Sequence, residues 1–508
     1  MSSYKRKFFV NTISNIMFRL LIMVLGIVLV PLIITNVGEE EYGLLLLTNN
    51  LMGYFLLLNA GMPTGVTKFV SEFMAKDEKM KAFEVINASM LFFMFIGLLS
   101  ATGIVIFINV GGINIFEITE ANVSTAVTLF YIAGFWSIIS WPMNNIFEGI
   151  YKGLQQFTKF NVINGIGSTL VLFTTLFLAY RKESIVTILL GQNLGQLLKW
   201  IALFYFFKKS FPDFKFSFNR DIFSVLKKIF SFSSHVFLQK VIGMIGFQSD
   251  KMILSMVVSV KAVTAYIIVH KTNNLVNQIV TLSNSALMPL ISELNSKQED
   301  RIIDRLVFAA TKYKNIVVIS LAIVMVFVTP PFITMWVGEN YIEFIFIAQV
   351  SAASLIFSHT RTNLPPYAIG IGKVKELSFA SIANATVKFI SAVLLVNLIG
   401  FDGIIYAEVI KGIISVFVAF FYLMPAIGVD TRRFIKEVVL KGDLRIVLFS
   451  LLFIPFYGLI QDISNWFLLV AVSGVMLLIL LLLSYYFVVE TNDRKKIQST
   501  IKKKLKTA

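Results

Sequence analysis

Cysteine is absent from this chain of 508 residues, and charged residues are scarce. Without a thiol, the protein can form no disulfide, hold no metal through a thiolate and use no cysteine nucleophile. Charged residues make up 15% of the chain and hydrophobic residues 57%, whereas a typical soluble protein carries about 25% charged residues. The composition therefore predicts an integral membrane protein whose apolar surface faces lipid.

Long polar segments are also missing, which excludes a sizeable soluble domain. A membrane-crossing helix needs about 20 apolar residues, and about fourteen such stretches follow one another. The first begins at Phe8, lacks a small-residue cleavage pattern and is interpreted as a retained helix rather than a signal peptide. The predicted all-α helices cover residues 8–36, 42–66, 83–109, 123–150, 157–180, 184–207, 229–258, 262–291, 305–328, 341–364, 376–397, 401–424, 443–460 and 465–489.

Catalytic and metal-binding motifs are missing as well. The string Gly370-Ile371-Gly372-Lys373 lacks the glycine spacing and the following Ser or Thr of a phosphate-binding loop. We therefore expect no enzyme activity, no cofactor and no metal. The formal net charge of +16 would indicate nucleic acid only if basic residues clustered with stacking aromatics in a soluble fold, so no nucleic-acid partner is expected.

The basic residues indicate membrane orientation instead. With the N-terminus inside, the cytoplasmic loops hold clusters such as Lys208-Lys209 and Arg432-Arg433, whereas the outer loops hold Glu39 to Glu41 and Glu339. This asymmetry follows the positive-inside rule and predicts that both termini are cytoplasmic.

An internal repeat divides the chain. Ser71-Glu72 with Lys76 recurs as Ser292-Glu293 with Lys297, a displacement of 221 residues (71 to 292) that also carries Arg19 onto Lys240. Six predicted helices lie in each half, so the halves should share one orientation. The predicted domains are an N-terminal six-helix lobe (1–207), a cytoplasmic linker (208–228), a C-terminal six-helix lobe (229–424), two additional transmembrane helices (425–489) and a basic cytoplasmic tail (490–508).

Ionisable residues inside the predicted helices mark the candidate site, because a charge at a helix centre costs about 2.5–3.5 kcal/mol on the insertion scale. Cations outnumber the acids at depth, Asp250 and Glu408, and Glu408 is the expected local partner of Lys411, one turn away. The surplus predicts a water-filled, electropositive cavity. Polar stripes also recur at helical spacing, although such residues can simply join helices by hydrogen bonds. The stripes are Asn11, Asn15 and Arg19; His270, Asn273, Asn277, Thr281 and Asn284; and Ser381, Asn384, Lys388 and Ser391.

Three segments carry a family resemblance. These are Pro31 to Gly38 with Glu41-Tyr42-Gly43 after it, Leu57 to Pro63, and Asp250 to Leu254 ahead of Tyr266. In them the sequence resembles the multidrug/oligosaccharidyl-lipid/polysaccharide exporter (MOP) superfamily and, within it, the polysaccharide transporter family of Wzx-type flippases. The resemblance implies a MATE-like fold, with two six-helix lobes in a V around a central cavity and two extra C-terminal helices.

The resemblance also implies a function. The protein would move an oligosaccharide repeat unit on undecaprenyl diphosphate from the cytoplasmic to the outer leaflet of the bacterial cytoplasmic membrane by alternating access, for O-antigen, capsule or exopolysaccharide. The expected partners are this lipid-linked substrate, membrane lipid, H+ or Na+ as coupling ion, and polysaccharide polymerase components.

The candidate residues follow from the chemistry, because a diphosphate needs cations and sugars need amide partners. The expected diphosphate ligands are Arg19, Lys240, Lys271 and Lys388. The expected sugar contacts are Asn15, Asn274, Asn277 and Asn384. The candidates for ion coupling are Asp250, His270 and Glu408.

Two alternatives share the superfamily. A lipid II flippase would have the same helices and a cationic cavity, and nothing in the sequence excludes it. An ion-coupled multidrug antiporter is disfavoured by the extra helices and the surplus of cations. A membrane glycosyltransferase or polymerase would need a larger outer loop with catalytic acids than Val110 to Asn122.

Overall fold

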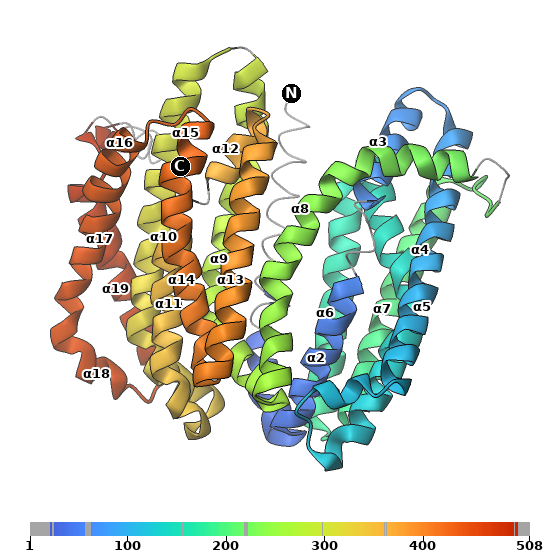
Figure 1. Ribbon diagram of the computed structural model, residues 1–508, viewed down its shortest axis with the longest axis horizontal. Coiled ribbons are helices and arrows are strands. Elements are labelled where there is room, and N and C mark those ends of the chain that lie inside the picture. The colour runs from blue at the N-terminus through green and yellow to red at the C-terminus, as the bar shows by residue number, and fades with distance from the viewer. Residues whose placement is uncertain are drawn as a thin grey trace, which may run out of the picture. The chain divides into compact units, whose positions relative to one another are not determined.

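The structure, a computed structural model, describes residues 21–22, 25–55, 62–154, 156–217, 222–296, 298–359, 361, 363–491 and 493–495. For residues 231–248, several between 272 and 300, and residues 54, 64, 75, 157 and 359, it describes the backbone alone. The described residues form helices joined by turns, with no strand among them (Figure 1). The α-helices are α2 (Glu39–Phe55), α3 (Met62–Ala75), α4 (Lys79–Asn109), α5 (Val123–Gly153), α6 (Phe157–Tyr180), α7 (Ile185–Ser210), α8 (Ile222–Val257), α9 (Val260–Ser296), α10 (Asp300–Val337), α11 (Ile345–His359), α12 (Leu364–Gly370), α13 (Val374–Ile399), α14 (Asp402–Val418), α15 (Met424–Ala426), α16 (Thr431–Phe434), α17 (Leu444–Phe449), α18 (Tyr457–Gln461) and α19 (Trp466–Phe487).

Shorter helical types fill some of the connections. The 3-10 helices are η2 (Gly112–Ile115), η3 (Glu120–Asn122), η4 (Glu339–Phe344) and η7 (Ser450–Phe456). The π-helices are η5 (Ala419–Leu423) and η6 (Ile435–Asp443), so the chain stays helical between α14 and α15 and between α16 and α17.

The predicted all-α membrane fold is confirmed. Within the described residues, ten helical stretches are long and apolar enough to cross a membrane, judged by length and composition. The count of fourteen stays a prediction, and the helix bounds are consistent with it. For example, α2 begins shortly before the predicted range 42–66 and α3 ends after it. Helices α8 and α9 correspond to the predicted ranges 229–258 and 262–291.

The start of α2 differs from the predicted start at residue 42. The helix begins at Glu39, so the three glutamates assigned to an outer loop form its first turn, where the helix dipole favours negative charge. Glu40 is buried and accepts hydrogen bonds from Thr119 N at 2.8 Å and from Thr119 Oγ1 at 2.9 Å. The segment before α5 is thereby held to the N-terminus of α2.

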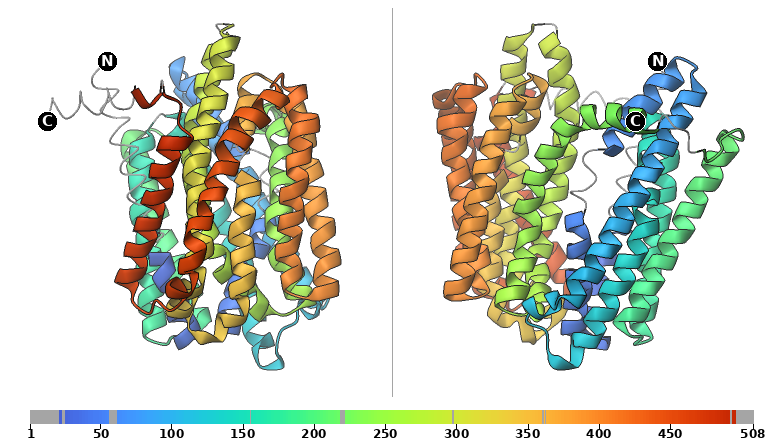
Figure 2. Two further views of the ribbon diagram at one scale, coloured as in Figure 1. Left: turned by 90° about the vertical axis from the view of Figure 1, so that its left-hand side faces the viewer. Right: turned by 45° about the vertical axis from the view of Figure 1, so that its right-hand side comes forward.

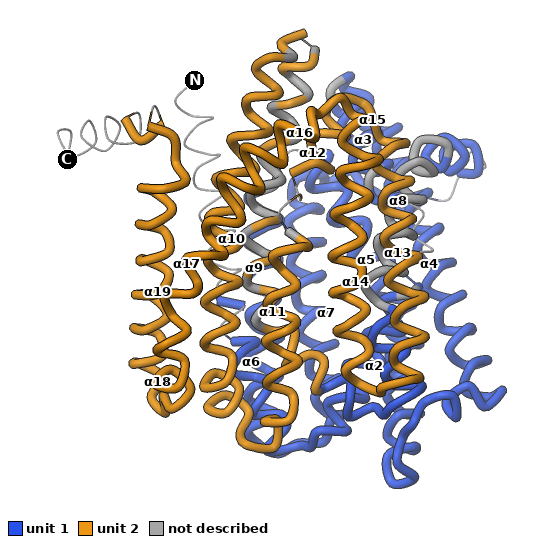
Figure 3. The backbone as a smooth tube through the Cα atoms, turned by 60° about the vertical axis from the view of Figure 1, so that its left-hand side comes forward, with its two compact units in different colours: residues 1–264 blue, residues 265–508 orange. Residues whose placement is uncertain are grey.

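The helices group into two compact units, residues 1–264 and 265–508 (Figure 3). The boundary falls inside α9. Helix α8, which the sequence assigned to the second lobe, packs against α2, α3 and α4 within unit 1. The six-helix lobes, which rest on the internal repeat, stay a prediction.

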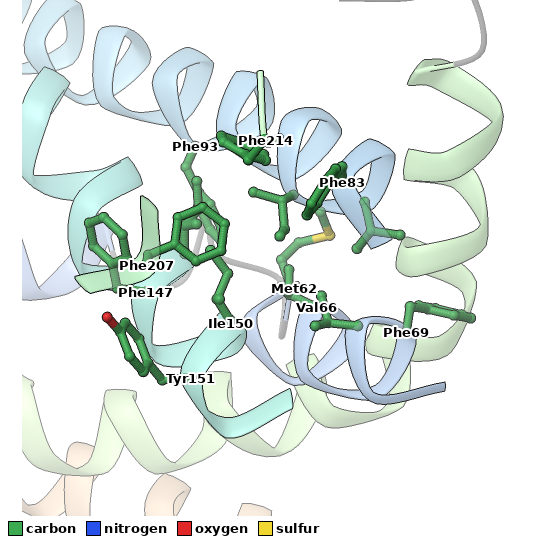
Figure 4. Packing of buried hydrophobic residues seen from close by; sticks show 14 of the residues in the cluster. Met62, Val66, Phe69, Phe83, Phe93, Phe147, Ile150, Tyr151, Phe207 and Phe214 are labelled. Carbon is green, nitrogen blue, oxygen red and sulfur yellow. The ribbon is translucent and has the colours of Figure 1, made fainter. Parts of the chain in front are cut away.

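Unit 1 has an aromatic core in which the connection after α7 takes part (Figure 4). Phe214 is 2% exposed, and its ring centroid lies 5.2 Å from that of Phe83 and 5.0 Å from that of Phe207. Asn87 Nδ2 donates to the carbonyl of Lys215 at 3.1 Å. The predicted polar linker therefore begins with residues that are packed into the unit.

Unit 2 holds the C-terminal helices against α10. Helix α19 lies beside α10 and α17 (Figure 2), and an apolar cluster joins Phe327 of α10 to Phe453 and Leu480. A buried polar contact adds to this packing, because Asn315 Nδ2 donates to Asp443 Oδ1 at 3.0 Å. The additional C-terminal helices are therefore part of the packed unit.

Candidate functional site

A buried ionic cluster lies in unit 2, where three helices each contribute one ionisable side chain. Lys388 of α13 places Nζ 3.7 Å from Glu408 Oε1 of α14. His270 of α9 places Nε2 3.7 Å from Glu408 Oε2. The exposed fractions of these side chains are 5% for Lys388, 15% for Glu408 and 13% for His270. One carboxylate thus faces two basic groups in a site with little access to water.

The α13–α14 hairpin sets the position of two of these groups. Gly400 ends α13 with φ +68°, in the left-handed region that glycine adopts without strain. The backbones then approach so closely that a Cβ on Gly403 would lie 2.4 Å from the carbonyl carbon and oxygen of Leu395. Glu408 comes six residues after Asp402, about 9 Å along the helix, so the cluster lies at membrane depth.

Neighbouring polar groups on α9 continue the cluster. The ring of Tyr266 lies 4.1 Å, centroid to centroid, from that of His270 one turn along the helix. One turn in the other direction, Asn273 Nδ2 donates to Ser351 Oγ of α11 at 2.8 Å. The predicted stripe on this helix therefore faces protein at His270 and Asn273, where it joins α9 to α11 and α14.

The structure adds two partners to the pairing predicted for Glu408. The sequence paired it with Lys411 one turn away and placed Lys388 among the expected diphosphate ligands. In the structure, Lys388 and His270 lie beside Glu408, and Lys411 acts on the same carboxylate through its charge. Contacts between different helices, which the spacing within one helix does not reveal, decide this arrangement. The proposed role of Lys388 in substrate binding stays a prediction.

The other predicted residues are distributed over both units. Asn15 and Arg19 lie outside the described residues, and Lys240 lies within α8 in a segment described by its backbone alone. Asp250 is fully buried in α8, in unit 1. On α9, Lys271 and Asn277 are half-buried and Asn274 is exposed, and on α13 Asn384 is half-buried.

Unit 1 contains a polar cavity that the sequence analysis missed. It has a volume of about 410 Å³ and lies between α2, α5 and α7. We call it the unit 1 cavity. The residues that define it are Asn49, Ser140, Asn144, Asn145, Asn193 and Gln196, together with Trp136 and Trp141.

Tryptophan and asparagine side chains around this cavity are held in place by ring stacking and hydrogen bonds. Trp136 and Trp200 stack with ring centroids 5.7 Å apart and planes inclined by 25°. Trp200 Nε1 donates to Asn144 Oδ1 at 2.9 Å, and Asn145 Nδ2 donates to the carbonyl of Trp141 at 2.8 Å. Pro142 lies inside α5, which continues without a break to Gly153.

Two solved structures of membrane transporters share the fold of this chain. Over 94% of this chain and 99% of the other, the structure matches the lipid II flippase MurJ in an inward closed conformation, with a TM-score of 0.70 and 14% sequence identity. Over 80% of this chain and 94% of the other, it matches a multidrug resistance MATE family transporter of the MOP superfamily in an inward-facing conformation, with a TM-score of 0.67 and 14% identity. The fold is that of MOP-superfamily membrane transporters.

The sequence gives the particular family. Residues 8–295 match the family model described as "Polysaccharide biosynthesis protein", and the chain belongs to this family. A relative from Bacillus subtilis (strain 168), described as "Uncharacterized membrane protein EpsK", is 22% identical in an alignment of length 483 that covers 92% of each chain. The family resemblance and the MATE-like fold inferred from the sequence are thus confirmed.

Proposed function

We propose that the protein is a flippase that moves undecaprenyl-diphosphate-linked oligosaccharide repeat units from the cytoplasmic to the outer leaflet of a bacterial cytoplasmic membrane. The observation that carries the proposal is the match of more than half of the chain to the polysaccharide biosynthesis family, in a chain with a transporter fold. The translocated repeat units are then used to assemble O-antigen, capsule or another exopolysaccharide.

The chemistry of the substrate agrees with the residues available. A diphosphate attracts cations, and Arg19, Lys240 and Lys271 are the ligands we propose for it. Sugar hydroxyls pair with amides, for which Asn15, Asn274, Asn277 and Asn384 are candidates. Lys388 has Glu408 beside it, so we propose that it contributes to the diphosphate site only when that carboxylate becomes protonated.

The cluster around Glu408 supports a proposal for ion coupling. A carboxylate between a lysine and a histidine can exchange a proton, because protonating any one member changes the charge balance for the others. In this proposal, proton movement through His270 and Glu408 favours one state of an alternating-access cycle over the other. Asp250 stays a second candidate for coupling, in unit 1.

A lipid II flippase is the second candidate function. The observation that favours it is the likeness to MurJ over 94% of the chain, which is a likeness of fold. The two functions differ in the sugar-bearing lipid that is moved, so the lipid that accumulates in the absence of the protein separates them.

A deletion strain tests the proposal. We expect lipid-linked repeat units of the cell's exported polysaccharide to accumulate while the amount of lipid II stays normal. Wild-type protein should reverse this accumulation, and Arg19→Ala and Lys240→Ala should fail to do so although both proteins are present in the membrane. Accumulation of lipid II instead would favour the second candidate, and normal levels of both lipids would refute both.

A further inference from the structure

The unit 1 cavity carries polar groups that the packing of the unit does not use. Asn193 is 5% exposed. It lies eight residues past the start of α7, about 12 Å along the helix, and thus at membrane depth. Within the described part of the chain, neither Asn193 Nδ2 nor Trp136 Nε1 has a hydrogen-bond partner. Leaving a buried donor unpaired costs about 1–3 kcal/mol, so these two donors in the wall are groups that a ligand with acceptors would satisfy.

The electrostatics of the cavity favour an uncharged ligand. Of the described residues that line it, one is ionisable, Glu148, and this residue forms an ion pair with Lys152 one turn along α5. Both side chains are at least 40% exposed, which places the pair at the rim. An anion such as a diphosphate would need lysine or arginine in the wall, and a metal cation would need several carboxylates.

The wall combines aromatic faces with amides, the combination that suits a sugar. A pyranose ring has apolar C–H faces, which pack on tryptophan, and a rim of hydroxyls that donate and accept. Trp136 and Trp141 supply aromatic surface, and Asn49, Asn193 and Gln196 supply amides that can do both. The volume of about 410 Å³ lies in the range of about 300–1,000 Å³ found for small-molecule sites.

From these observations we infer that the unit 1 cavity binds one uncharged sugar residue of the transported oligosaccharide, between Trp136, Trp141 and Asn193. The inference deepens the proposed function, on which it rests for the choice of ligand. It assigns the diphosphate and the sugar to separate places, because the cavity lacks the cations that the diphosphate needs. None of these residues was among the predicted sugar contacts.

Tryptophan fluorescence of the full-length protein tests the inference. The chain has five tryptophans, and replacing Trp336 and Trp466 of unit 2 by phenylalanine leaves the three at or beside the cavity. We would titrate this protein in lipid nanodiscs with neutral methyl glycosides of glucose, galactose, mannose, N-acetylglucosamine and N-acetylgalactosamine. A saturable change with at least one glycoside is expected, and none with inorganic pyrophosphate.

Variants connect the signal to the cavity. Asn193→Leu keeps the branched shape and the number of side-chain heavy atoms but removes the amide, and it should weaken glycoside binding about tenfold or more. Gln196→Ala, at a half-buried position of the wall, should weaken binding in the same direction, and it serves if Asn193→Leu does not fold. The matched control is Asn109→Ala in the same unit, where an exposed amide donates to Val105 O of its own helix. This control should bind like the parent protein.

The outcomes separate the inference from the proposed function when transport of lipid-linked oligosaccharide is measured on the same proteins. Transport without saturable glycoside binding would overturn the inference and leave the function standing, because the cavity would then hold water alone. Saturable glycoside binding that Asn193→Leu removes would support the inference. If the parent protein binds glycosides in this way but moves no lipid-linked oligosaccharide, the absence of transport would refute the proposed function. Equal binding by Asn193→Leu, Gln196→Ala and the control would also overturn the inference.

Discussion

Replacing Glu408 by glutamine removes the negative charge from a site where Lys388 Nζ and His270 Nε2 each lie 3.7 Å from a carboxylate oxygen. At an effective dielectric constant of about 20, two unit charges at 3.7 Å attract by roughly 4 kcal/mol. Breaking a buried pair costs about 3–5 kcal/mol, because the partner stays buried without compensation. We therefore expect Glu408→Gln to lower the thermal unfolding midpoint of the purified protein markedly.

The double variant Lys388→Met with Glu408→Gln removes both charges and should recover most of this loss, since a buried ion pair is often replaceable by uncharged groups. The matched control is Glu376→Gln, also in unit 2, whose carboxylate lies 3.5 Å from Lys373 Nζ in a pair with side chains 27% and 48% exposed. An exposed pair contributes about 0–1 kcal/mol. The reasoning is refuted if Glu408→Gln melts like the control, or if the effects of the two cluster substitutions simply add.

Two further predictions concern packing and orientation. Gly403→Ala should lower the free energy of unfolding by about 1–3 kcal/mol, because its Cβ would meet the Leu395 backbone at 2.4 Å. The control is Gly474→Ala, which should be neutral or slightly stabilising in the same unfolding assay, because a Cβ on Gly474 meets nothing within 4 Å. Equal unfolding midpoints for the two variants would contradict this prediction. Single cysteines at the exposed positions Glu120 and Ser217 should react differently with an impermeant thiol reagent in intact cells, with labelling at Glu120 and protection at Ser217, and the reverse pattern would invert the predicted topology.

The helices were predictable because a membrane-crossing helix is recognised from local composition alone, as a long apolar run with polar residues at its ends. The predicted range 157–180 and the helix α6 (Phe157–Tyr180) coincide, and the loop acids at Glu39 and Glu40 were displaced only into the first turn of α2. The structure of the connections was harder to predict, since hydropathy does not reveal a π-helix such as η6.

The candidate site was predictable only in part, because its residues come from three different helices. Helical spacing identified His270 and Lys388 as polar residues inside the membrane, but their shared partner Glu408 lies on a third helix. The unit 1 cavity was missed for the same reason. Asn49 and Asn193 lie in short polar groups on two different helices, and only the packing of α2, α5 and α7 brings them to one cavity.

Transport by the purified protein is the most direct test of the central claim. The protein would be reconstituted into liposomes with undecaprenyl-diphosphate-linked oligosaccharide in both leaflets, and a membrane-impermeant sugar-modifying enzyme would be added outside. We predict that the enzyme modifies almost all of the lipid-linked oligosaccharide in liposomes that contain the wild-type protein. In liposomes without protein, it should modify only the half that lies in the outer leaflet. Modification of only the outer half in both preparations would contradict the account.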